Sequence, residues 1–327
     1  MYHLGAGVSR KDERMQPLRP EKPATARPAP LLPRRLRSGS VIGVTAPASP
    51  FAPDLLERGV RVLREMGFEV RFSEELFDSC GYLAGSDEHR AAAFNRLVAD
   101  PQIDAIMCAR GGYGSLRILP LLDYARVAEH PKAVIGFSDV TALLWALYAR
   151  CGLIGFHGPL VTTLADAAPA DRSALWSAVA AEGPLRLRFE TAAVIRPGRA
   201  CAPVAGGNLT TLCHLLGTPY APAFRDHIVF LEDRGEAPYR LDRMLTQMKM
   251  AGCFDGMQGL VLGSFEECGA REEVWRVVAE VFGDAEWPIL AGVDAGHSGP
   301  NVTIPLGVET ALDAEDRTLV FESATVD

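Results

Sequence analysis

The sequence predicts an α/β protein with a parallel-sheet amino-terminal domain and a second, strand-rich domain. Over residues 41–156, short apolar runs rich in Val and Ile alternate with stretches whose apolar residues recur at helical spacing. After about Leu160, Ala- and Asp-rich sequence leads to a series of shorter strand-like runs. The 327 residues are enough for two domains. Alternating strands and helices form a parallel sheet, which binds ligands at the carboxyl ends of its strands.

Local signals place the elements of the amino-terminal part. Gly67 ends the first amphipathic helix, and Ser86 opens the second, with Asp87 and Glu88 at the positive end of its dipole. The expected strands are residues 40–47, 68–72, 105–108, 133–137 and 153–156. The expected helices are residues 54–66, 86–99 and 141–147.

The part that follows combines short strands with short helices. We expect strands at residues 185–189, 192–195, 227–231, 260–263, 289–292, 301–306 and 318–322. We expect helices at residues 208–216, 239–250 and 274–282. The chain then divides into an extension (1–37), an α/β domain (38–165), a linker region (166–195) and a carboxy-terminal domain (196–327).

Composition and charge argue against several classes of protein. Charged residues make up 23% of the chain and the formal net charge is −8, which argues against a nucleic-acid-binding protein. Positive charge gathers in the Pro- and Arg-rich residues 1–37, which we expect to form a disordered basic extension. No apolar run reaches the ~20 residues that span a bilayer, and the amino terminus lacks the hydrophobic core of a secretory signal. We therefore expect a cytoplasmic protein that does not associate with membranes.

The cysteines indicate the redox environment. All seven are dispersed in apolar surroundings, and none forms a C-x-x-C pair. Such an odd-numbered, scattered set is typical of reduced, buried thiols rather than of a disulfide framework or a zinc site. We expect no metal site.

Residues 133–147 contain the first candidate for chemistry, Ser138. An apolar strand breaks at Gly136-Phe137-Ser138-Asp139 directly into a helix. Such a turn exposes a serine at the carboxyl end of the sheet and leaves the next backbone N–H free to bind an oxyanion. The alternative is that Ser138 only caps the helix. Because Val140 stands at the second Gly position of the G-x-S-x-G signature, this stretch alone favours the cap.

A glycine-rich loop, ARGGYGS (109–115), follows the third expected strand. Its glycines let the backbone approach a ligand closely and direct N–H groups at negative charge. The spacing matches neither the dinucleotide-binding motif nor the Walker motif, so the support for a nucleotide phosphate is weak. An oxyanion hole also directs backbone N–H groups at negative charge, so it is another interpretation of this loop. A tight turn without a ligand is an equal alternative.

An acid and a histidine also stand at expected strand ends. Glu232 lies in FLEDRGE (230–236), where Asp233 and Glu236 are alternative acids, and His297 lies in a glycine-flanked loop. His157, in GFHGP at the end of the fifth strand, is an alternative base. The order Ser…Glu…His matches that of α/β hydrolases, although geometry rather than order defines a catalytic triad.

Five longer motifs then occur in a fixed order along the chain. They are GGYGSLRILPLLDY (111–124), IGFSDVTALL (135–144), GGNLTTLCHLLGTPY (206–220), FLEDRGEAPYRLDRMLTQM (230–248) and GHSGPNVTIPLG (296–307). Together they resemble the serine LD-carboxypeptidase family, which includes murein tetrapeptide carboxypeptidases and microcin C resistance peptidases. The resemblance extends from about Val41 to Phe321 and leaves out the basic extension.

The resemblance implies a fold and a catalytic triad. The implied fold is an amino-terminal parallel α/β (flavodoxin-like) sheet domain and a carboxy-terminal domain built around a small β-barrel. In the implied triad Ser138 is the nucleophile, Glu232 the acid and His297 the base, so the nucleophile lies in one domain and its two partners in the other.

The resemblance also implies contacts around the triad. Backbone N–H groups of Asp139 and of the Gly111-Gly112 turn are the expected oxyanion donors, and Asn208 is expected to face the substrate. A terminal carboxylate must also be held, for which Arg110 and Arg117 are the candidates.

The expected activity is hydrolysis of the LD-peptide bond of murein tetrapeptides, which releases the terminal D-Ala in cell-wall recycling without a metal or organic cofactor. One alternative is inactivation of peptidyl-nucleotide (microcin C-like) antibiotics by the same triad. Another is a non-hydrolytic nucleotide-binding protein that uses residues 111–114. The resemblance further implies a homodimer. Whether the third residue of the substrate is diaminopimelate or Lys stays open.

Overall fold

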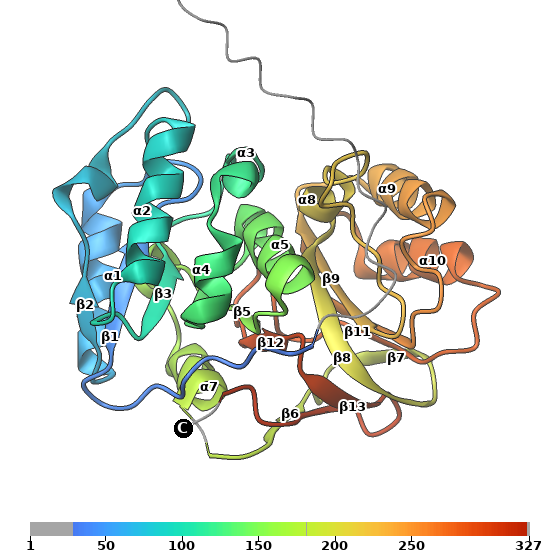
Figure 1. Cartoon of the computed structure of the whole chain (residues 1–327). Helices are drawn as coiled ribbons and strands as arrows, with labels where there is room; N and C mark the ends of the chain where they lie inside the picture. Colours follow the sequence, from blue (N-terminus) through green and yellow to red (C-terminus); the bar gives the residue numbers. More distant parts are fainter. Residues whose placement is uncertain (1–28, 181, 326–327) are drawn as a thin grey trace, which may run out of the picture.

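The computed structural model describes residues 29–180 and 182–325, which form two neighbouring sheets with helices packed on them (Figure 1). The predicted fold class is confirmed, since a parallel-sheet amino-terminal domain is joined to a separate carboxy-terminal sheet domain. Residues 1–28 of the expected extension lie outside the described residues. Within the described ranges, no helix is long and apolar enough to cross a membrane.

The first sheet has six strands in the order β2-β1-β3-β4-β5-β12. They are β1 (Val41–Thr45), β2 (Glu69–Arg71), β3 (Ala105–Cys108), β4 (Ala133–Gly136), β5 (Gly155–His157) and β12 (Ile304–Leu306). The first five are parallel and follow the flavodoxin-like order 2-1-3-4-5, whereas β12 is antiparallel to β5. Because β12 comes from the end of the chain, the first sheet includes a strand that the expected division at residues 166–195 assigns to the other domain.

Local sequence explains the helices around this sheet. Helix α1 has Pro at its start and buries Leu56, Val60 and Leu63 on one face. Helix α2 begins after Ser86, whose hydroxyl accepts a hydrogen bond from the His89 backbone N–H at 3.2 Å. The helices are α1 (Pro53–Glu65), α2 (Asp87–Ala99), α3 (Ser115–Ile118), α4 (Tyr124–Glu129), α5 (Thr141–Cys151), α6 (Val161–Leu164) and α7 (Pro169–Ala180).

Helix α5 lies between the two domains. Its sequence is apolar because both domains bury it. Every residue from 141 to 148 is buried. Its Trp145 Nε1 donates to the carbonyl oxygen of Tyr220 at 2.9 Å, and its Tyr148 hydroxyl lies 2.8 Å from His227 Nε2. A helix that is apolar on all sides is buried on all sides. The helix that follows Ser138 is therefore held by both domains.

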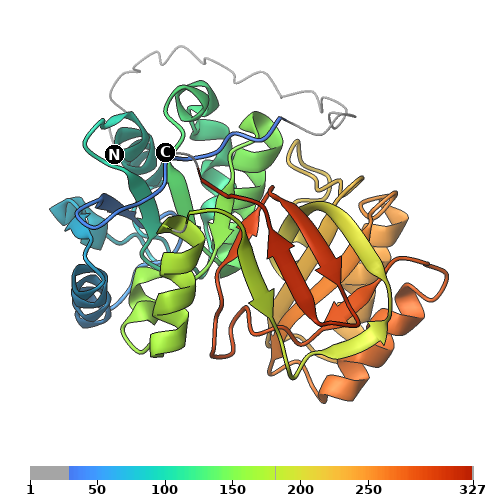
Figure 2. The same cartoon turned by 90° about the horizontal axis from the view of Figure 1, so that it is seen from below.

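The second sheet has eight strands in the order β6-β14-β13-β8-β9-β10-β11-β7. They are β6 (Leu185–Arg188), β7 (Ala193–Arg196), β8 (Arg199–Asn208), β9 (Ile228–Arg234), β10 (Gly259–Glu266), β11 (Ile289–Ala291), β13 (Glu309–Asp313) and β14 (Thr318–Phe321). The edge strands β6 and β7 are joined by residues 189–192 alone, so the sheet curls like a barrel (Figure 2).

Within this sheet β8, β9, β10 and β11 are parallel neighbours. The connecting helices are α8 (Leu209–Cys213), α9 (Pro238–Met250) and α10 (Arg271–Val281). Parallel strands carry their functional side chains at the carboxyl ends. The sheet therefore presents Asn208 at the end of β8 and Glu232 near the end of β9, directly opposite each other in register.

Two segments differ from the expected division of the chain. Residues 29–37 belong to the folded domain, because Leu31 pairs with Leu153 and the backbone N–H of the buried Leu36 donates to Val179 at 2.9 Å. Helix α7, in the expected linker region, packs on the amino-terminal domain, where the Trp176 and Phe68 rings lie 5.1 Å apart. The linker region also contains β6 and β7 of the second sheet.

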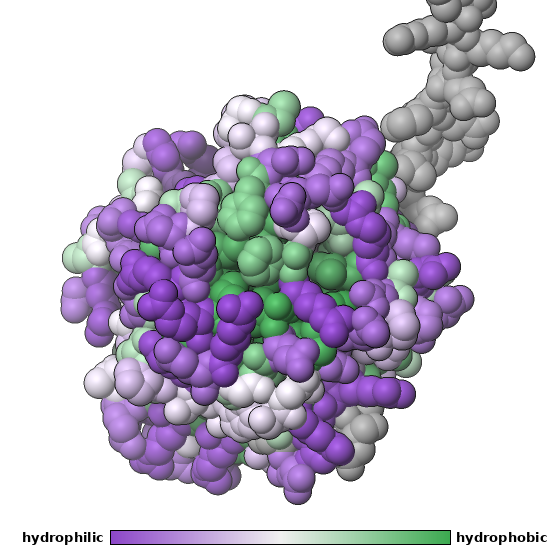
Figure 3. Space-filling model, turned by 90° about the vertical axis from the view of Figure 1, so that its left-hand side faces the viewer, coloured by the Kyte–Doolittle hydropathy of each residue, from purple (hydrophilic) through white to green (hydrophobic). Residues whose placement is uncertain are grey.

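The outer face of the amino-terminal domain has an apolar hollow ringed by hydrophilic side chains (Figure 3). Phe72 and Phe77, in the connection from β2 to α2, are two of the large exposed apolar residues of the molecule, and their rings lie 6.0 Å apart. The surface is thus not uniformly polar on this side.

All seven cysteines are free. Cys80 and Cys201 are exposed, so the expectation of buried thiols is wrong for these two. Among residues 29–180 and 182–325, no group of three His, Cys, Asp or Glu side chains is arranged to hold a metal ion.

Candidate active site

Ser138 occupies a strained turn between β4 and α5. Its φ is 64°, a left-handed backbone conformation that is costly for residues other than glycine and typical of a nucleophile at a strand-to-helix turn. The short 3₁₀ turn (Ser138–Val140) and α5 both lack a side-chain cap hydrogen bond. The alternative in which Ser138 merely caps a helix is therefore wrong. Gly136 makes the turn possible, because a Cβ there would lie 2.8 Å from Val140 Cγ1.

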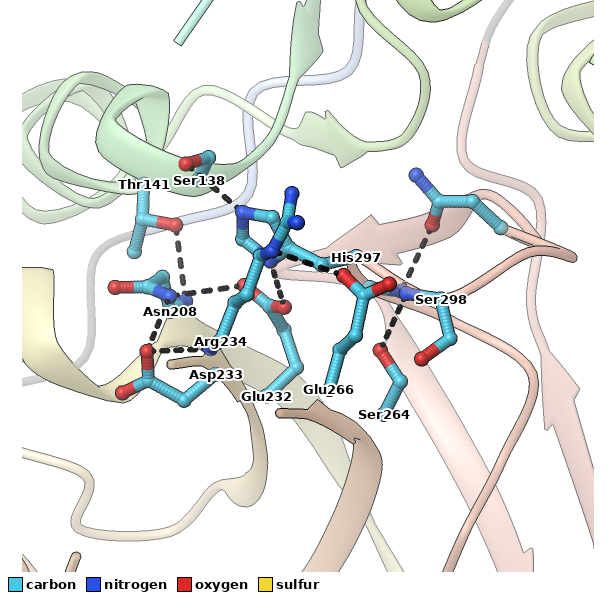
Figure 4. Close-up of polar contacts among 12 residues, drawn as sticks. Ser138, Thr141, Asn208, Glu232, Asp233, Arg234, Ser264, Glu266, His297 and Ser298 are labelled. Carbon is cyan, nitrogen blue, oxygen red and sulfur yellow. Dashed lines mark hydrogen bonds and ion pairs between the residues drawn. The ribbon is translucent and has the colours of Figure 1, made fainter. Parts of the chain in front are cut away.

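The three residues that sequence reasoning grouped as a triad form one chain of hydrogen bonds (Figure 4). His297 Nε2 lies 3.1 Å from the hydroxyl oxygen of Ser138, and His297 Nδ1 lies 2.6 Å from Glu232 Oε2. Glu232 is fully buried in β9, while the His297 side chain is 15% exposed. These distances are within reach for proton transfer between a serine and an imidazole.

The charge of Glu232 controls the electrostatics of His297. Burial alone would lower the pKa of His297, but the hydrogen bond and the negative charge of Glu232 outweigh it, so the pKa lies above its ordinary value. A carboxylate at Nδ1 also keeps the proton on that nitrogen, which leaves Nε2 of the neutral ring free to accept a proton.

Glu232 is held by a buried network that the sequence did not reveal. The Asn208 amide nitrogen donates to Glu232 Oε1 at 3.2 Å and to Asp233 Oδ1 at 3.1 Å (Figure 4). Its amide oxygen accepts from the backbone N–H and the hydroxyl of Thr211, both at 2.9 Å. Asn208 is 6% exposed. Its amide nitrogen therefore contacts two buried carboxylates, and its expected contact with a substrate stays a prediction.

The alternative acids and the alternative base have other partners. Asp233 is held by the backbone N–H and hydroxyl of Thr210, at 2.9 and 2.8 Å, and Glu236 pairs with an arginine of α9. His157 is fully buried, neither of its ring nitrogens has a hydrogen-bond partner among the described residues, and burial lowers its pKa to about 4. None of the three lies within hydrogen-bond reach of Ser138.

The glycine-rich loop lies directly against Ser138. A Cβ on Gly111 would lie 3.1 Å from the hydroxyl oxygen of Ser138, so only glycine fits this position without displacement. Gly112 has φ 101° and packs against Ser49. The carboxylate of Asp139, the residue after Ser138, accepts from the Ser115 backbone N–H at 2.8 Å. The loop is thus fixed to the Ser138 turn.

The buried side chain of Arg90 holds the glycine-rich loop by hydrogen bonds. Its guanidinium donates to the carbonyl oxygen of Gly114 at 2.9 Å and to that of Pro47, and it pairs with Asp87. Arg117 also pairs with Asp87, at 2.8 Å, and Arg110 donates to the carbonyl oxygen of Pro50 at 2.5 Å. Both candidate arginines for a substrate carboxylate therefore have protein partners.

The loop that carries His297 is held by residues that sequence reasoning did not single out. The Ser298 backbone N–H donates to Ser264 Oγ at 3.1 Å, and the Gly296 backbone N–H donates to Asn301 Oδ1 at 2.9 Å (Figure 4). Two features of the sequence could have indicated these residues. Asn301 lies within the GHSGPN motif, and Ser264 lies near the carboxyl end of the strand β10. Thr141 was equally missed, although its Oγ1 accepts from the Asn208 backbone N–H at 3.0 Å.

A two-domain α/β fold that aligns a serine, a histidine and a buried glutamate has the arrangement of a serine hydrolase. Family models agree with this class. The LD-carboxypeptidase N-terminal domain matches residues 42–158, and the LD-carboxypeptidase C-terminal domain matches residues 202–312. The chain belongs to the LD-carboxypeptidase family.

Relatives with names cover nearly the whole chain. A probable murein peptide carboxypeptidase of Bacillus subtilis is 34% identical over 301 residues, which are 89% of this chain and 94% of the relative. The murein tetrapeptide carboxypeptidase of Pseudomonas aeruginosa is 33% identical over 288 residues, covering 83% and 92%. The Microcin C7 self-immunity protein MccF of Escherichia coli is 31% identical over 327 residues, covering 89% and 95%.

Solved structures show the same likeness. The structure of MccF in complex with glutamyl sulfamoyl guanosine has a TM-score of 0.84 at 28% identity, over 90% of this chain and 98% of that chain. Both murein peptide carboxypeptidases and a microcin self-immunity protein are thus similar to this chain.

Proposed function

We propose that this protein is a serine LD-carboxypeptidase that removes the terminal D-Ala from murein tetrapeptides during cell-wall recycling. The observation that carries the proposal is the hydrogen-bonded order Glu232–His297–Ser138, with the serine at φ 64°. A serine hydroxyl is a weak nucleophile until a base accepts its proton, and His297 is in position to do so. The relatives named as murein peptide carboxypeptidases support the substrate class.

Acylation is the first half of the proposed reaction. His297 Nε2 removes the Ser138 proton while the serine oxygen attacks the carbonyl carbon of the LD-peptide bond. The oxyanion receives hydrogen bonds from backbone N–H groups of Asp139 and of the Gly111-Gly112 turn, which we assign as the oxyanion hole. The intermediate then collapses: the C–N bond breaks, the imidazolium gives its proton to the D-Ala amine, and an ester remains on Ser138.

Deacylation repeats the sequence with water. Neutral His297 takes a proton from a water molecule, whose oxygen attacks the ester carbonyl. Collapse of the second intermediate returns the proton to Ser138 and releases the shortened peptide. Glu232 stabilises the imidazolium in both halves and keeps the ring oriented. The residues named supply the nucleophile, the base and the charge stabilisation.

The direct test compares wild type with Ser138→Ala on a murein tetrapeptide. Mass spectrometry should detect free D-Ala and the tripeptide with wild type. Ser138→Ala should reduce the rate by at least about 10⁴-fold, because the nucleophile is removed. Circular dichroism and thermal unfolding of Ser138→Ala beside wild type check that the variant is folded. Release of D-Ala at the wild-type rate by Ser138→Ala would exclude the mechanism.

A second candidate substrate is a peptidyl-nucleotide antibiotic, cleaved by the same triad. The similarity to MccF over 89% of the chain favours it. An aminoacyl sulfamoyl nucleoside is a suitable probe, because the wild-type enzyme should cleave it only if its site admits a nucleoside. Comparing kcat/KM for this probe and for the tetrapeptide decides which substrate the enzyme prefers.

We also propose that the enzyme is a cytoplasmic homodimer. The seven free cysteines suit a reducing compartment. Sedimentation equilibrium of the purified protein tests the assembly, and fractionation of cells that express the full chain tests the compartment. A mass of one chain at working concentration would contradict the dimer.

A further inference from the structure

The loop that carries His297 crosses from one domain to the other. Residues 292–303 leave the second sheet after β11 and enter the first sheet at β12, so the two ends of the loop belong to different domains. The imidazole contacts both domains as well. Its Nδ1 lies 2.6 Å from Glu232 of the second sheet, and its Nε2 lies 3.1 Å from Ser138, which follows β4 of the first sheet. A displacement of this loop away from β4 would therefore lengthen the hydrogen bond to Ser138.

Hydrogen bonds join the two ends of this loop. The Gly296 backbone N–H donates to the Asn301 side chain at 2.9 Å, and the Val302 backbone N–H donates to the Asp294 carbonyl oxygen at 2.7 Å. Because of these bonds, a contact that fixes Asn301 also limits where Gly296, the residue before His297, can lie.

A buried aspartate of helix α7 makes such a contact. Asp171 Oδ1 accepts from the Asn301 backbone N–H at 3.0 Å, although 130 residues separate the two positions. Its other oxygen, Oδ2, accepts from the Ala168 backbone N–H at 3.2 Å. Asp171 is 7% exposed. A buried carboxylate needs hydrogen-bond donors, and one of the two donors here comes from the loop that carries His297.

Helix α7 is itself fixed to the amino-terminal domain, where the Trp176 ring lies 5.1 Å from that of Phe68. Asp171 therefore connects the loop to the domain that carries Ser138. Side chains of β9 and β10 connect the same loop to the other domain. The position of His297 between the two domains thus depends on contacts from both of them.

The alternative role of Asp171 is a helix cap. It is the third residue of α7, where an acid commonly accepts from the backbone N–H that precedes the helix. The bond from Ala168 is of this kind and uses only Oδ2. The bond from Asn301 joins two separate segments and contributes nothing to the cap, so the cap does not account for it.

We propose that Asp171 is a positioning residue that holds the loop against the amino-terminal domain and so keeps His297 Nε2 within reach of the Ser138 hydroxyl. It acts through Asn301 and Gly296 and does not contact the substrate. This role rests on the proposed carboxypeptidase function for its reaction. Loss of the contact should lower kcat rather than raise KM, because a shift of about 1 Å in a reacting group can cost about 10²-fold in rate.

The experiment compares Asp171→Ala with wild type on the murein tetrapeptide. The variant should lower kcat about 10- to 100-fold and leave KM within about threefold of wild type. Asp171→Asn keeps one side-chain acceptor for the Asn301 N–H, so its kcat should return to within about threefold of wild type. A higher KM with an unchanged kcat in Asp171→Ala would overturn the inference, because Asp171 would then bind substrate. So would equal losses of kcat in the two variants.

The matched control is Trp176→Leu, which weakens the packing of the same helix at a ring that faces Phe68. It should lower the melting temperature at least as much as Asp171→Ala does, and it should leave kcat unchanged. An equal fall of kcat in the two variants would overturn the inference, because a loosened α7 would then explain both losses.

A double-mutant cycle with Asn301→Ala tests the route from Asp171 to the histidine. The two substitutions break successive contacts of one path, so the double variant should stay within about twofold of the slower single variant. Fully additive losses would show that Asp171 does not act through Asn301, and the proposed route would be wrong.

A proton NMR signal separates this inference from the proposed function. The proton between His297 Nδ1 and Glu232 should give a downfield resonance, assigned by its absence in His297→Ala. The resonance should shift or weaken in Asp171→Ala and stay in place in Trp176→Leu. If it does so but wild type releases no D-Ala, the proposed function fails and the positioning role stands. If wild type releases D-Ala and Asp171→Ala matches it in both kcat and resonance, the function stands and the positioning role fails.

Discussion

The two sides of the candidate active site are built in different ways. On the amino-terminal side, Ser138 is positioned by contiguous chain: β4, a turn and α5 occupy residues 133–151. On the carboxy-terminal side, His297 lies in a loop that is held by Glu232 of β9, Ser264 of β10 and the side chain of Asn301. The position of Ser138 depends on local backbone geometry, and that of His297 depends on contacts from distant segments.

This difference separates two kinds of sensitivity. Substitutions on the serine side should act through the backbone turn and the space around one hydroxyl. Substitutions on the histidine side should act through hydrogen bonds and charge, since the loop has no regular secondary structure to hold it.

The largest effect should separate the two histidines near the site. His297→Ala should lower kcat/KM about 10⁴-fold, because within residues 29–180 and 182–325 no other base hydrogen-bonds to Ser138. His157→Leu should stay within about tenfold of wild type, because the buried, neutral ring of His157 makes no hydrogen bond that the reaction uses. Steady-state kinetics on the tetrapeptide measures both, and wild-type activity in His297→Ala would refute the assignment of the base.

Glu232→Gln should reveal the electrostatic dependence of the carboxy-terminal side. His297 acts only when neutral, so wild-type kcat/KM should fall as pH drops through its raised pKa, above 6.5. Glu232→Gln removes the charge that raises this pKa, so the acidic limb should move to lower pH while the rate falls about 10³- to 10⁴-fold.

The pH profile of kcat/KM for the two proteins is the measurement. Glu236→Gln, which alters an acid that pairs with α9, is the matched control and should keep the wild-type limb. If the acidic limb of the pH profile stays in place in Glu232→Gln, the titration of another group determines the pH dependence of kcat/KM.

Gly111→Ala tests the amino-terminal side of the site by adding one methyl group next to Ser138. The added Cβ would lie 3.0 Å from Ser138 Cβ, so the hydroxyl or the loop must move. We expect kcat to fall about 10²-fold, comparable to loss of one oxyanion donor, with an unchanged acidic limb in the pH profile. Gly283→Ala, at the end of α10 and far along the chain from the loop, serves as the control. A shifted limb would mean that the two sides are coupled through this loop.

The smallest effect on rate should come from Asn208→Ala. Its amide nitrogen donates to two buried carboxylates, and removing it leaves both without that donor. We expect kcat to fall about tenfold and the free energy of unfolding to fall by about 1–3 kcal/mol. Urea denaturation and steady-state kinetics measure the two effects, with Asn95→Ala as the control in α2. An unchanged stability would show that the network does not depend on Asn208.

Much of the fold was predictable because its strands and helices follow periodic local patterns. The strands of the first sheet and the helices α1, α2 and α9 lie within a few residues of their expected bounds. Two strands were missed, β8 and β13. The central β8 contains Gly206-Gly207 and few β-branched residues, so it lacks the usual strand signal, and pairing on both sides compensates for that.

The candidate site likewise has residues that the sequence indicated and contacts that only the structure shows. Motifs identified Ser138, Glu232 and His297, and strand-end positions supported them. The resemblance assigned Asn208 to the substrate side, but a motif does not show where a side chain points. The register of β8 against β9 places Asn208 opposite Glu232, to which its amide nitrogen donates.

Sequence alone was sufficient for the class of fold, for the order of most elements and for singling out the three side chains that the structure joins by hydrogen bonds, because these depend on periodicity and on short motifs. Tertiary structure decided which carboxylate contacts the imidazole and which histidine lies within hydrogen-bond reach of Ser138. Those outcomes depend on burial and on distances between segments up to 159 residues apart, quantities that no local pattern contains.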